Sequence, residues 1–142
     1  MQLAIEQAQS AALRGEVPIG AVITLENQIL AVGSNRTITD CDPTAHAEIV
    51  ALREAARKIG NYRLIGASLY VTLEPCAMCA GALVQARISR LVYGADEPKG
   101  GAIRTCLQVL DAPMLNHRVE VVSGVRAEDS VQLLQSFFAA RR

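Results

Sequence analysis

The stretch Thr72-Leu-Glu-Pro-Cys-Ala-Met-Cys79 follows an apolar, β-branched run and precedes a helical pattern. Pro75 suits the first turn of a helix, where its missing N–H is no loss. Cys76 and Cys79 are three positions apart, so at a helix start both thiols can face the same way. The positive field of a helix N-terminus lowers the pKa of a thiol and favours metal binding. The stretch therefore predicts a strand-to-helix junction that presents two metal ligands.

A second stretch, Pro43-Thr-Ala-His-Ala-Glu48, supplies His46 and Glu48 at the start of another predicted helix. Open α/β sheets place their sites where such junctions meet at the ends of adjacent strands. Zinc prefers thiolate and imidazole ligands in a tetrahedron. We therefore expect His46, Cys76 and Cys79 to converge on one zinc ion.

The number of these ligands bears on function. Three protein ligands leave the fourth position of a tetrahedral zinc ion to water, which is the arrangement of catalytic sites. Zinc lowers the pKa of that water toward ~7. Glu48 is then the natural proton shuttle, because a carboxylate can first accept the water proton and then deliver it to a leaving nitrogen.

Other kinds of protein could use the same cysteines. A closed structural zinc site would need a fourth ligand from Cys41, Cys106 or His117, and it would leave Glu48 without a role. A thioredoxin-like dithiol would leave both His46 and Glu48 idle. We interpret Cys41 as a loop thiol, Cys106 as packed in an apolar helix and His117 as ordering the turn before the last strand. A non-catalytic, zinc-stabilised module that binds RNA or protein is a further alternative, and it requires a saturated metal site.

Periodicity and turn residues give an alternating series of elements. The predicted helices are residues 2–14, 45–58 with Thr44 as N-cap, 77–87, about 105–111 and 128–142, and the predicted strands are 17–24, 29–32, 68–73, 90–93 and 119–122. The run 68–73 is the best candidate for a central strand. Met1 already falls inside the helical pattern of the first helix, with no capping residue before it, which suggests that a few residues precede it. The alternation predicts an α/β fold with helices on both faces of a sheet.

Composition narrows the classes of protein. The 142 residues fit one domain, residues 1–142. Lys+Arg and Asp+Glu are both 14, so the zero formal charge does not favour indiscriminate nucleic-acid binding. A local run with Arg53, Arg57, Lys58 and Arg63 against one acid indicates either a solvated helix face or an RNA contact. No membrane span or signal peptide is visible, so we expect a cytoplasmic protein with reduced cysteines.

The two stretches together spell H-x-E…P-C-x-x-C, which is the signature of zinc nucleobase deaminases. Further blocks extend over nearly the whole chain, and they are Glu16-Val-Pro-Ile-Gly-Ala21, Asn61-Tyr-Arg-Leu64, Asn116-His-Arg118 and Phe137-Phe138. With them the chain resembles the bacterial tRNA-specific adenosine deaminases, which belong to the cytidine-deaminase-like superfamily.

The resemblance implies hydrolytic deamination of the wobble adenosine of tRNA to inosine, by a homodimer whose subunits each hold one zinc ion. It implies a three-layer α/β/α fold with a mixed five-stranded sheet. It also implies roles for residues of this chain: zinc ligation by His46, Cys76 and Cys79, proton transfer by Glu48, contacts to the base by Asn35 and the backbone of Ala47, contact to RNA by Asn116, and packing of Phe137, Phe138, Arg141 and Arg142 near the anticodon loop.

Three points stay open at this stage. Deaminases of a free base or nucleoside, of the guanine or cytosine type, would share the zinc site and the glutamate, so they are the alternative. After Gly100-Gly101 the family often has small residues, whereas this chain has Ile103-Arg104-Thr105. On chemistry alone, Asn35 at a strand end is more often a turn residue, although its amide could pair with a purine edge.

Overall fold

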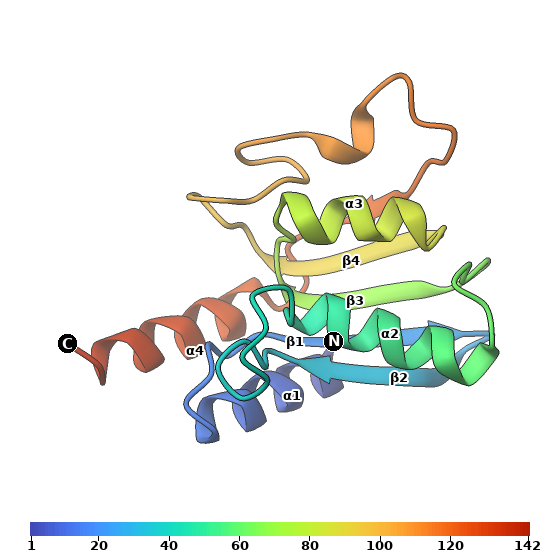
Figure 1. The fold of residues 1–142 in the computed structure, drawn as a ribbon. Coiled ribbons are helices and arrows are strands. Elements are labelled where there is room, and N and C mark those ends of the chain that lie inside the picture. The colour runs from blue at the N-terminus through green and yellow to red at the C-terminus, as the bar shows by residue number, and fades with distance from the viewer.

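A five-stranded sheet lies between two pairs of helices in the computed structural model, which describes residues 1–142 (Figure 1). Its elements are α1 Gln2–Leu13, β1 Gly20–Leu25, β2 Gln28–Ser34, α2 Ala47–Ile59, β3 Ser68–Leu73, α3 Ala77–Gln85, β4 Arg90–Ala95, the 3₁₀ turn η1 Val109–Asp111, β5 Glu120–Val122 and α4 Ala127–Ala139. Helices α2 and α3 pack on one face of the sheet, and α1 and α4 on the other. The predicted three-layer α/β/α fold is confirmed.

The sheet is mixed, with strand order β2-β1-β3-β4-β5. Strand β1 pairs antiparallel with β2 and β3, whereas β3, β4 and β5 run parallel. Residues 68–73 do form the central strand. The β1–β2 turn consists of Glu26 and Asn27, whose φ angles of 52° and 62° are those of a two-residue hairpin turn that matches strand twist.

Glycine 33 sets how closely α2 approaches the sheet. A Cβ atom at Gly33 would lie 2.4 Å from the carbonyl oxygen of Ala47 and 2.7 Å from the amide nitrogen of Ala51. Only glycine allows this backbone-to-backbone approach without a shift. Since Ala47 directly follows His46, Gly33 helps to fix the position of that histidine above the sheet.

The helix predicted at residues 105–111 is wrong, because only the short turn η1 forms there. The amide groups of Ile103, Arg104 and Thr105 donate to the side chain of Glu74, about thirty positions earlier in the chain. The amide of Val109 donates to the carbonyl oxygen of Ala102 at 3.0 Å, and not to that of Thr105 as a helix over residues 105–111 would require. Cys106 is consequently exposed, not packed in an apolar helix as expected.

Helix α2 begins later than predicted. Thr44 is not its N-cap, because the Thr44 hydroxyl donates to Asp42 Oδ1 at 2.7 Å. The helix starts at Ala47, after His46 in an extended conformation. Helix α3 likewise starts after an extended Cys76 and ends at Gln85, shortly before Arg87 adopts a left-handed conformation with φ 59°.

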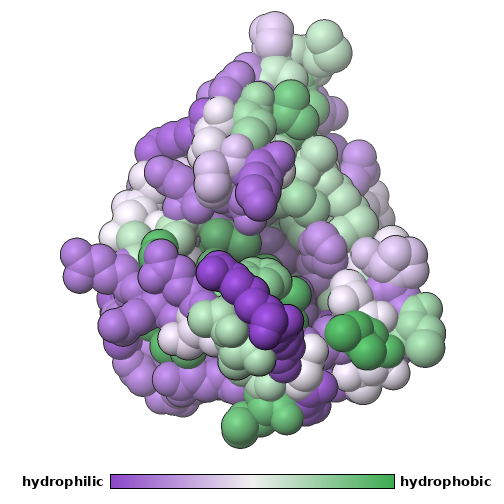
Figure 2. Space-filling view, turned by 90° about the vertical axis from the view of Figure 1, so that its left-hand side faces the viewer, coloured by the Kyte–Doolittle hydropathy of each residue, from purple (hydrophilic) through white to green (hydrophobic).

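Helix α4 crosses β3 and β4 on the face opposite α2 and α3. Its two aromatic side chains differ as expected: Phe137 is buried, and Phe138 is 48% exposed. Figure 2 shows the end of the molecule toward which the C-terminal end of α4 projects, where hydrophilic and hydrophobic side chains are interspersed. None of the helices combines the length and apolar character needed to cross a membrane.

Candidate metal centre and active site

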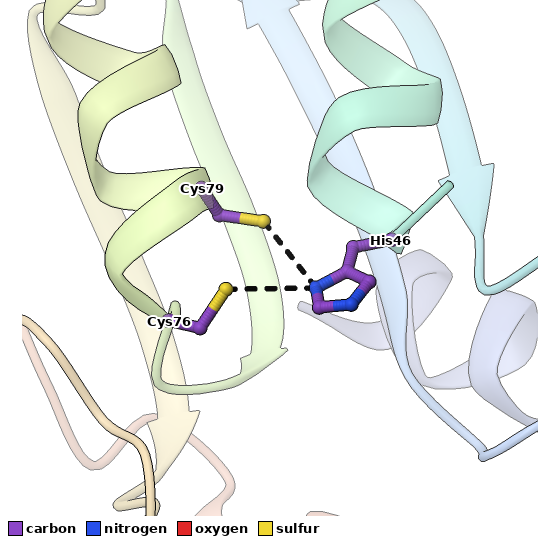
Figure 3. A group of neighbouring side chains, drawn as sticks. All are labelled: His46, Cys76 and Cys79. Atoms are coloured by element: carbon purple, nitrogen blue, oxygen red, sulfur yellow. Dashed lines mark hydrogen bonds between the residues drawn. The ribbon is translucent and has the colours of Figure 1, made fainter. Parts of the chain in front are cut away.

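Helices α2 and α3 lie side by side with their first residues at the same end, which brings the three predicted ligands together (Figure 3). The Nδ1 atom of His46 is 3.6 Å from the sulfur of Cys76 and 3.6 Å from that of Cys79. All three donor atoms lie within 4.8 Å of one another. His46 and Cys76 are the residues just before α2 and α3, and Cys79 lies in the first turn of α3.

This donor set fits a tetrahedral zinc ion. Zinc binds thiolate sulfur at about 2.3 Å and imidazole nitrogen at about 2.0–2.1 Å, so a tetrahedral angle separates such a nitrogen and sulfur by about 3.6 Å. Both observed nitrogen–sulfur distances are 3.6 Å. The side chains are thus arranged as ligands of a single ion would be.

The three residues considered as a fourth ligand lie elsewhere. Cys41 and Cys106 are exposed, and the Cys106 thiol donates to the carbonyl oxygen of Pro98 at 3.2 Å. His117 Nε2 lies 2.7 Å from the carbonyl oxygen of Ile88, consistent with a role in ordering the turn. None of them belongs to the group formed by His46 and its two cysteines, so the geometry does not support a closed site.

The acidity of the Cys76 thiol suits this group to binding a cation. Hydrogen bonds from Cys79 and then from His46 lower the pKa of Cys76 to about 3. The same pairing with Cys76, together with burial, raises the pKa of the Cys79 thiol. The hydrogen bond to Cys76 raises the pKa of His46. A thiolate therefore exists here at neutral pH, and a thiolate is the form that binds metal.

Glu48 lies in the first turn of α2, beside Cys79, and is only 4% exposed. Burial raises the pKa of its carboxyl group. A cavity of about 330 Å³ opens beside it. Its lining includes His46, Glu48 and Cys76 on the metal side and Glu97, Lys99 and Gly100 on the loop after β4. Small-molecule sites in proteins begin at about this volume.

Asn35 and Ala47 meet next to His46. The Oδ1 atom of Asn35 accepts a hydrogen bond of 3.0 Å from the amide of Ala47, and Asn35 is 6% exposed. The first N–H groups of a helix have no partner within the helix, so Asn35 caps α2 from the end of β2. Its Nδ2 group donates to no other residue and stays available. The resemblance implied a base contact for Asn35, and this capping bond was not predicted from the sequence.

Asn116 is not brought to the cavity. It is exposed, and its Oδ1 accepts a hydrogen bond of 2.9 Å from Arg87 Nη1. Arg87 follows the C-terminal end of α3, whereas Cys76 precedes the N-terminal end of the same helix. Within one chain, Asn116 and the metal ligands therefore lie at opposite ends of α3.

Two buried carboxylates were not singled out from the sequence. Glu74 and Glu16 are 3% and 0% exposed, yet neither has a cationic partner. Burial alone would raise the pKa of each carboxyl, but hydrogen bonds from backbone amides and threonine hydroxyls outweigh it. The pKa of Glu74 is lowered to about 2, and that of Glu16 is also lowered. The only signal in the sequence was an acidic residue among apolar neighbours.

Two of the four basic residues in the run at residues 53–63 have acidic partners. Arg53 lies 3.3 Å from Asp42, and Lys58 lies 3.5 Å from Glu54. These pairs are exposed to solvent, where such interactions contribute little energy. The pairing favours the interpretation of this run as a solvated helix face.

The chain matches deaminases in each comparison with known proteins. The sequence model of the MafB19-like deaminases matches residues 1–142. The chain is 50% identical over 143 residues to the tRNA-specific adenosine deaminase of Haemophilus influenzae, covering 100% of this chain and 83% of that protein. A structure from a study of A-to-I editing by tRNA:A34 deaminases at the wobble position superimposes with a TM-score of 0.92 at 48% identity, over 94% of this chain and 97% of that one. The guanine deaminase of Bacillus subtilis has a TM-score of 0.66 at 32% identity, over 99% and 90% of the two chains.

The buried Glu16 carboxylate gives a prediction about stability and pH. It accepts hydrogen bonds from the amides of Ile38 and Thr39, at 3.0 and 2.7 Å, and from the hydroxyls of Thr37 and Thr39. Because its folded-state pKa is below the unfolded value of about 4.3, it stabilises the protein above that pH, and this contribution disappears as pH falls through the folded-state pKa. Glu16→Gln should therefore lower the free energy of unfolding at pH 7 by roughly 1–3 kcal/mol.

Denaturant unfolding at pH 7 and at about pH 3 measures this effect, since the difference from wild type should shrink on acidification. Glu120→Gln is the matched control, because the Glu120 side chain is 68% exposed and its loss should leave stability within about 0.5 kcal/mol. An equal loss of stability at both pH values would show that charge on Glu16 is unimportant.

Proposed function

Because this chain belongs to the tRNA-specific adenosine deaminases, within the MafB19-like deaminases, we propose that it converts the wobble adenosine of tRNA to inosine by hydrolysis. The observation that carries the proposal is the full-length match to such an enzyme together with a metal-ligand group and a buried glutamate on one cavity. Residues 1–142 would act as one catalytic domain in the cytoplasm, where tRNA is available.

We propose that His46, Cys76 and Cys79 hold one zinc ion per subunit. The nitrogen–sulfur spacing and the acidic Cys76 thiol support this assignment. When bound, zinc supplies a Lewis acid that makes water nucleophilic near neutral pH. The chain contributes the ligand positions, which the starts of α2 and α3 set.

Glu48 is proposed to move the proton of the reaction. Hydrolysis forms a bond from water oxygen to C6 of adenine and breaks the bond from C6 to the amino nitrogen, which leaves as ammonia. One water proton must therefore travel to the departing nitrogen. The Glu48 carboxylate borders the cavity next to His46 and Cys76, so it can accept that proton at Oε and pass it on.

Asn35, Ala47 and Asn116 are proposed to contact the RNA. Since Ala47 donates to Oδ1 of Asn35, the amide plane of Asn35 is held and its Nδ2 is left to donate to an acceptor on the base. Ala47 would thus contribute to binding of the base indirectly, by holding the side chain of Asn35. Asn116 would contact RNA beyond the cavity of its own chain, because it lies at the far end of α3.

We also propose a homodimer. A shallow hollow of about 330 Å³ between α2 and α3 is lined mainly by apolar side chains, including Ile49, Leu52, Ala82 and the 63%-exposed Tyr62. Exposed apolar surface of this kind often marks a protein interface. Sedimentation of the purified protein at micromolar concentration should give the mass of two chains, and the mass of one chain would contradict the proposal.

A deaminase of a free base or nucleoside is the second candidate, since the guanine deaminase of Bacillus subtilis is 32% identical. The zinc-loaded protein should be incubated with an unmodified tRNA that carries adenosine at the wobble position, and in parallel with adenosine, guanine and cytidine. We expect inosine only in the tRNA, detected by mass spectrometry of its nucleosides. The same tRNA with guanosine at the wobble position is the control, and turnover of a free compound without editing of tRNA would favour the second candidate.

The ligand assignment predicts loss of metal on substitution. His46→Ala or Cys76→Ala removes one of three donors, so purified protein should contain much less than one zinc per chain by elemental analysis. Cys41→Ala is the matched control, because that thiol is exposed outside the site and zinc should stay stoichiometric. Full zinc content in either ligand variant would count against this set.

The proton-transfer role predicts that Glu48→Ala retains zinc but loses turnover. General acid–base catalysis contributes typically 10²–10⁴-fold, so kcat should fall by about that factor or more. Single-turnover editing of tRNA measures it, with zinc content determined on the same sample. Glu54→Ala, on the exposed side of α2, should keep its activity, and an active Glu48→Ala enzyme would refute the shuttle.

A further inference from the structure

The Glu74 carboxylate is the most heavily hydrogen-bonded side chain near the cavity. Its Oε1 accepts from the amide of Glu97 at 3.1 Å and from the hydroxyl of Thr105. Its Oε2 accepts from the amides of Ile103, Arg104 and Thr105 at 3.1, 3.0 and 3.0 Å. Five donors from one loop thus converge on one buried side chain, which has no cation beside it.

The loop is shaped around this carboxylate. A Cβ atom at Gly101 would lie 2.5 Å from the carboxyl carbon of Glu74, so glycine is required for the loop to pass so close. The amide of Ala102 donates to the carbonyl oxygen of Pro75 at 2.8 Å, which ties the same loop to the residue before Cys76. Ile103, Arg104 and Thr105 therefore supply four of the five donors.

The same loop forms one wall of the cavity. Glu97, Lys99 and Gly100 line it together with His46, Glu48 and Cys76. Glu74 itself stands two residues before Cys76 and also lines the cavity. One side chain therefore joins this loop to the segment that carries the metal ligands.

We propose that Glu74 is a positioning residue for the substrate: it holds residues 97–105 as a fixed wall against which the nucleoside is bound. It does not reach the reacting atoms, and its five hydrogen bonds are all made within the chain. A fixed wall lowers the cost of ordering the loop when substrate binds. The inference rests on the proposed function for the identity of the substrate, but the anchoring of the loop does not.

Three variants separate this role from general stability. Glu74→Gln keeps the size of the side chain but replaces one acceptor oxygen with an NH2 group, which cannot accept hydrogen bonds from the loop amides. Thr105→Val keeps Glu74 intact and removes only the hydroxyl donor, whereas Thr105→Ser retains that donor and is its matched control. Each variant is examined as zinc-loaded full-length protein for zinc content, for amide hydrogen exchange along the loop, and for kcat and KM on the wobble-adenosine tRNA.

We expect exchange of the Ile103, Arg104 and Thr105 amides to be faster by roughly 10- to 100-fold in Glu74→Gln, since buried bonds to a charge are lost. The β3 and β4 amides should keep their protection, and zinc should stay stoichiometric. KM should rise on the order of 10-fold with kcat nearly unchanged, because the wall contributes equally to binding of substrate and transition state. Thr105→Val should show the same pattern more weakly, and Thr105→Ser should resemble wild type.

The possible outcomes distinguish the anchoring of the loop, the positioning role of Glu74 and the proposed function. Unchanged exchange in the loop would overturn the anchor, even if the tRNA assay failed, because that measurement needs no substrate. Faster exchange with unaltered KM would overturn the positioning role. A fall in kcat with unaltered KM would also overturn it. If Glu74→Gln fails to fold, the comparison of Thr105→Val with Thr105→Ser decides. Absence of editing by the wild-type enzyme would instead contradict the proposed function.

Discussion

The first turns of α2 and α3 have to lie close enough for three donor atoms to share one ion. Gly33 lets the backbone of α2 pack against β2. Strand β3, which pairs in parallel with β4, leads directly to the start of α3. The cysteines then sit in the field of the α3 N-terminus, where negative charge on sulfur is stabilised. The remaining parts of the site follow from this approach, since Glu48 and the cavity are adjacent to the same two helix starts.

Irregular segments around the site are held by buried carboxylates instead of by helix or sheet. Glu16 gathers residues 37–39, which follow Asn35, and Glu74 gathers residues 97–105, which face the metal ligands. A carboxylate that accepts several N–H bonds remains charged even when buried, so it can organise a loop without a cationic partner. The loop held by Glu74, which lines the cavity, thereby gains a defined shape without helix or strand.

Sequence reasoning could predict much of this site because its chemistry is local. The i, i+3 spacing of Cys76 and Cys79 and the pattern around His46 required only the start of a helix. What it missed depends on partners far along the chain. The segment that leads into the helix predicted at 105–111 is bound to Glu74, and Val109 donates to Ala102 instead of Thr105, so that helix does not form. The cap of α2 is Asn35, which follows β2, and not Thr44. Asn116 was assigned to RNA contact, but only the structure reveals its bond to Arg87 at the far end of α3.

The central claim is a metal site with three protein donors and room for one exogenous ligand. The most direct test is the visible absorption spectrum of the cobalt-substituted protein, titrated with a small anion that binds metals. Intense bands of a tetrahedral thiolate site that shift as the anion is added would agree with the open site proposed on His46, Cys76 and Cys79. A spectrum that does not respond to the anion would mean that a fourth side chain completes the coordination, and the enzymatic account would be contradicted.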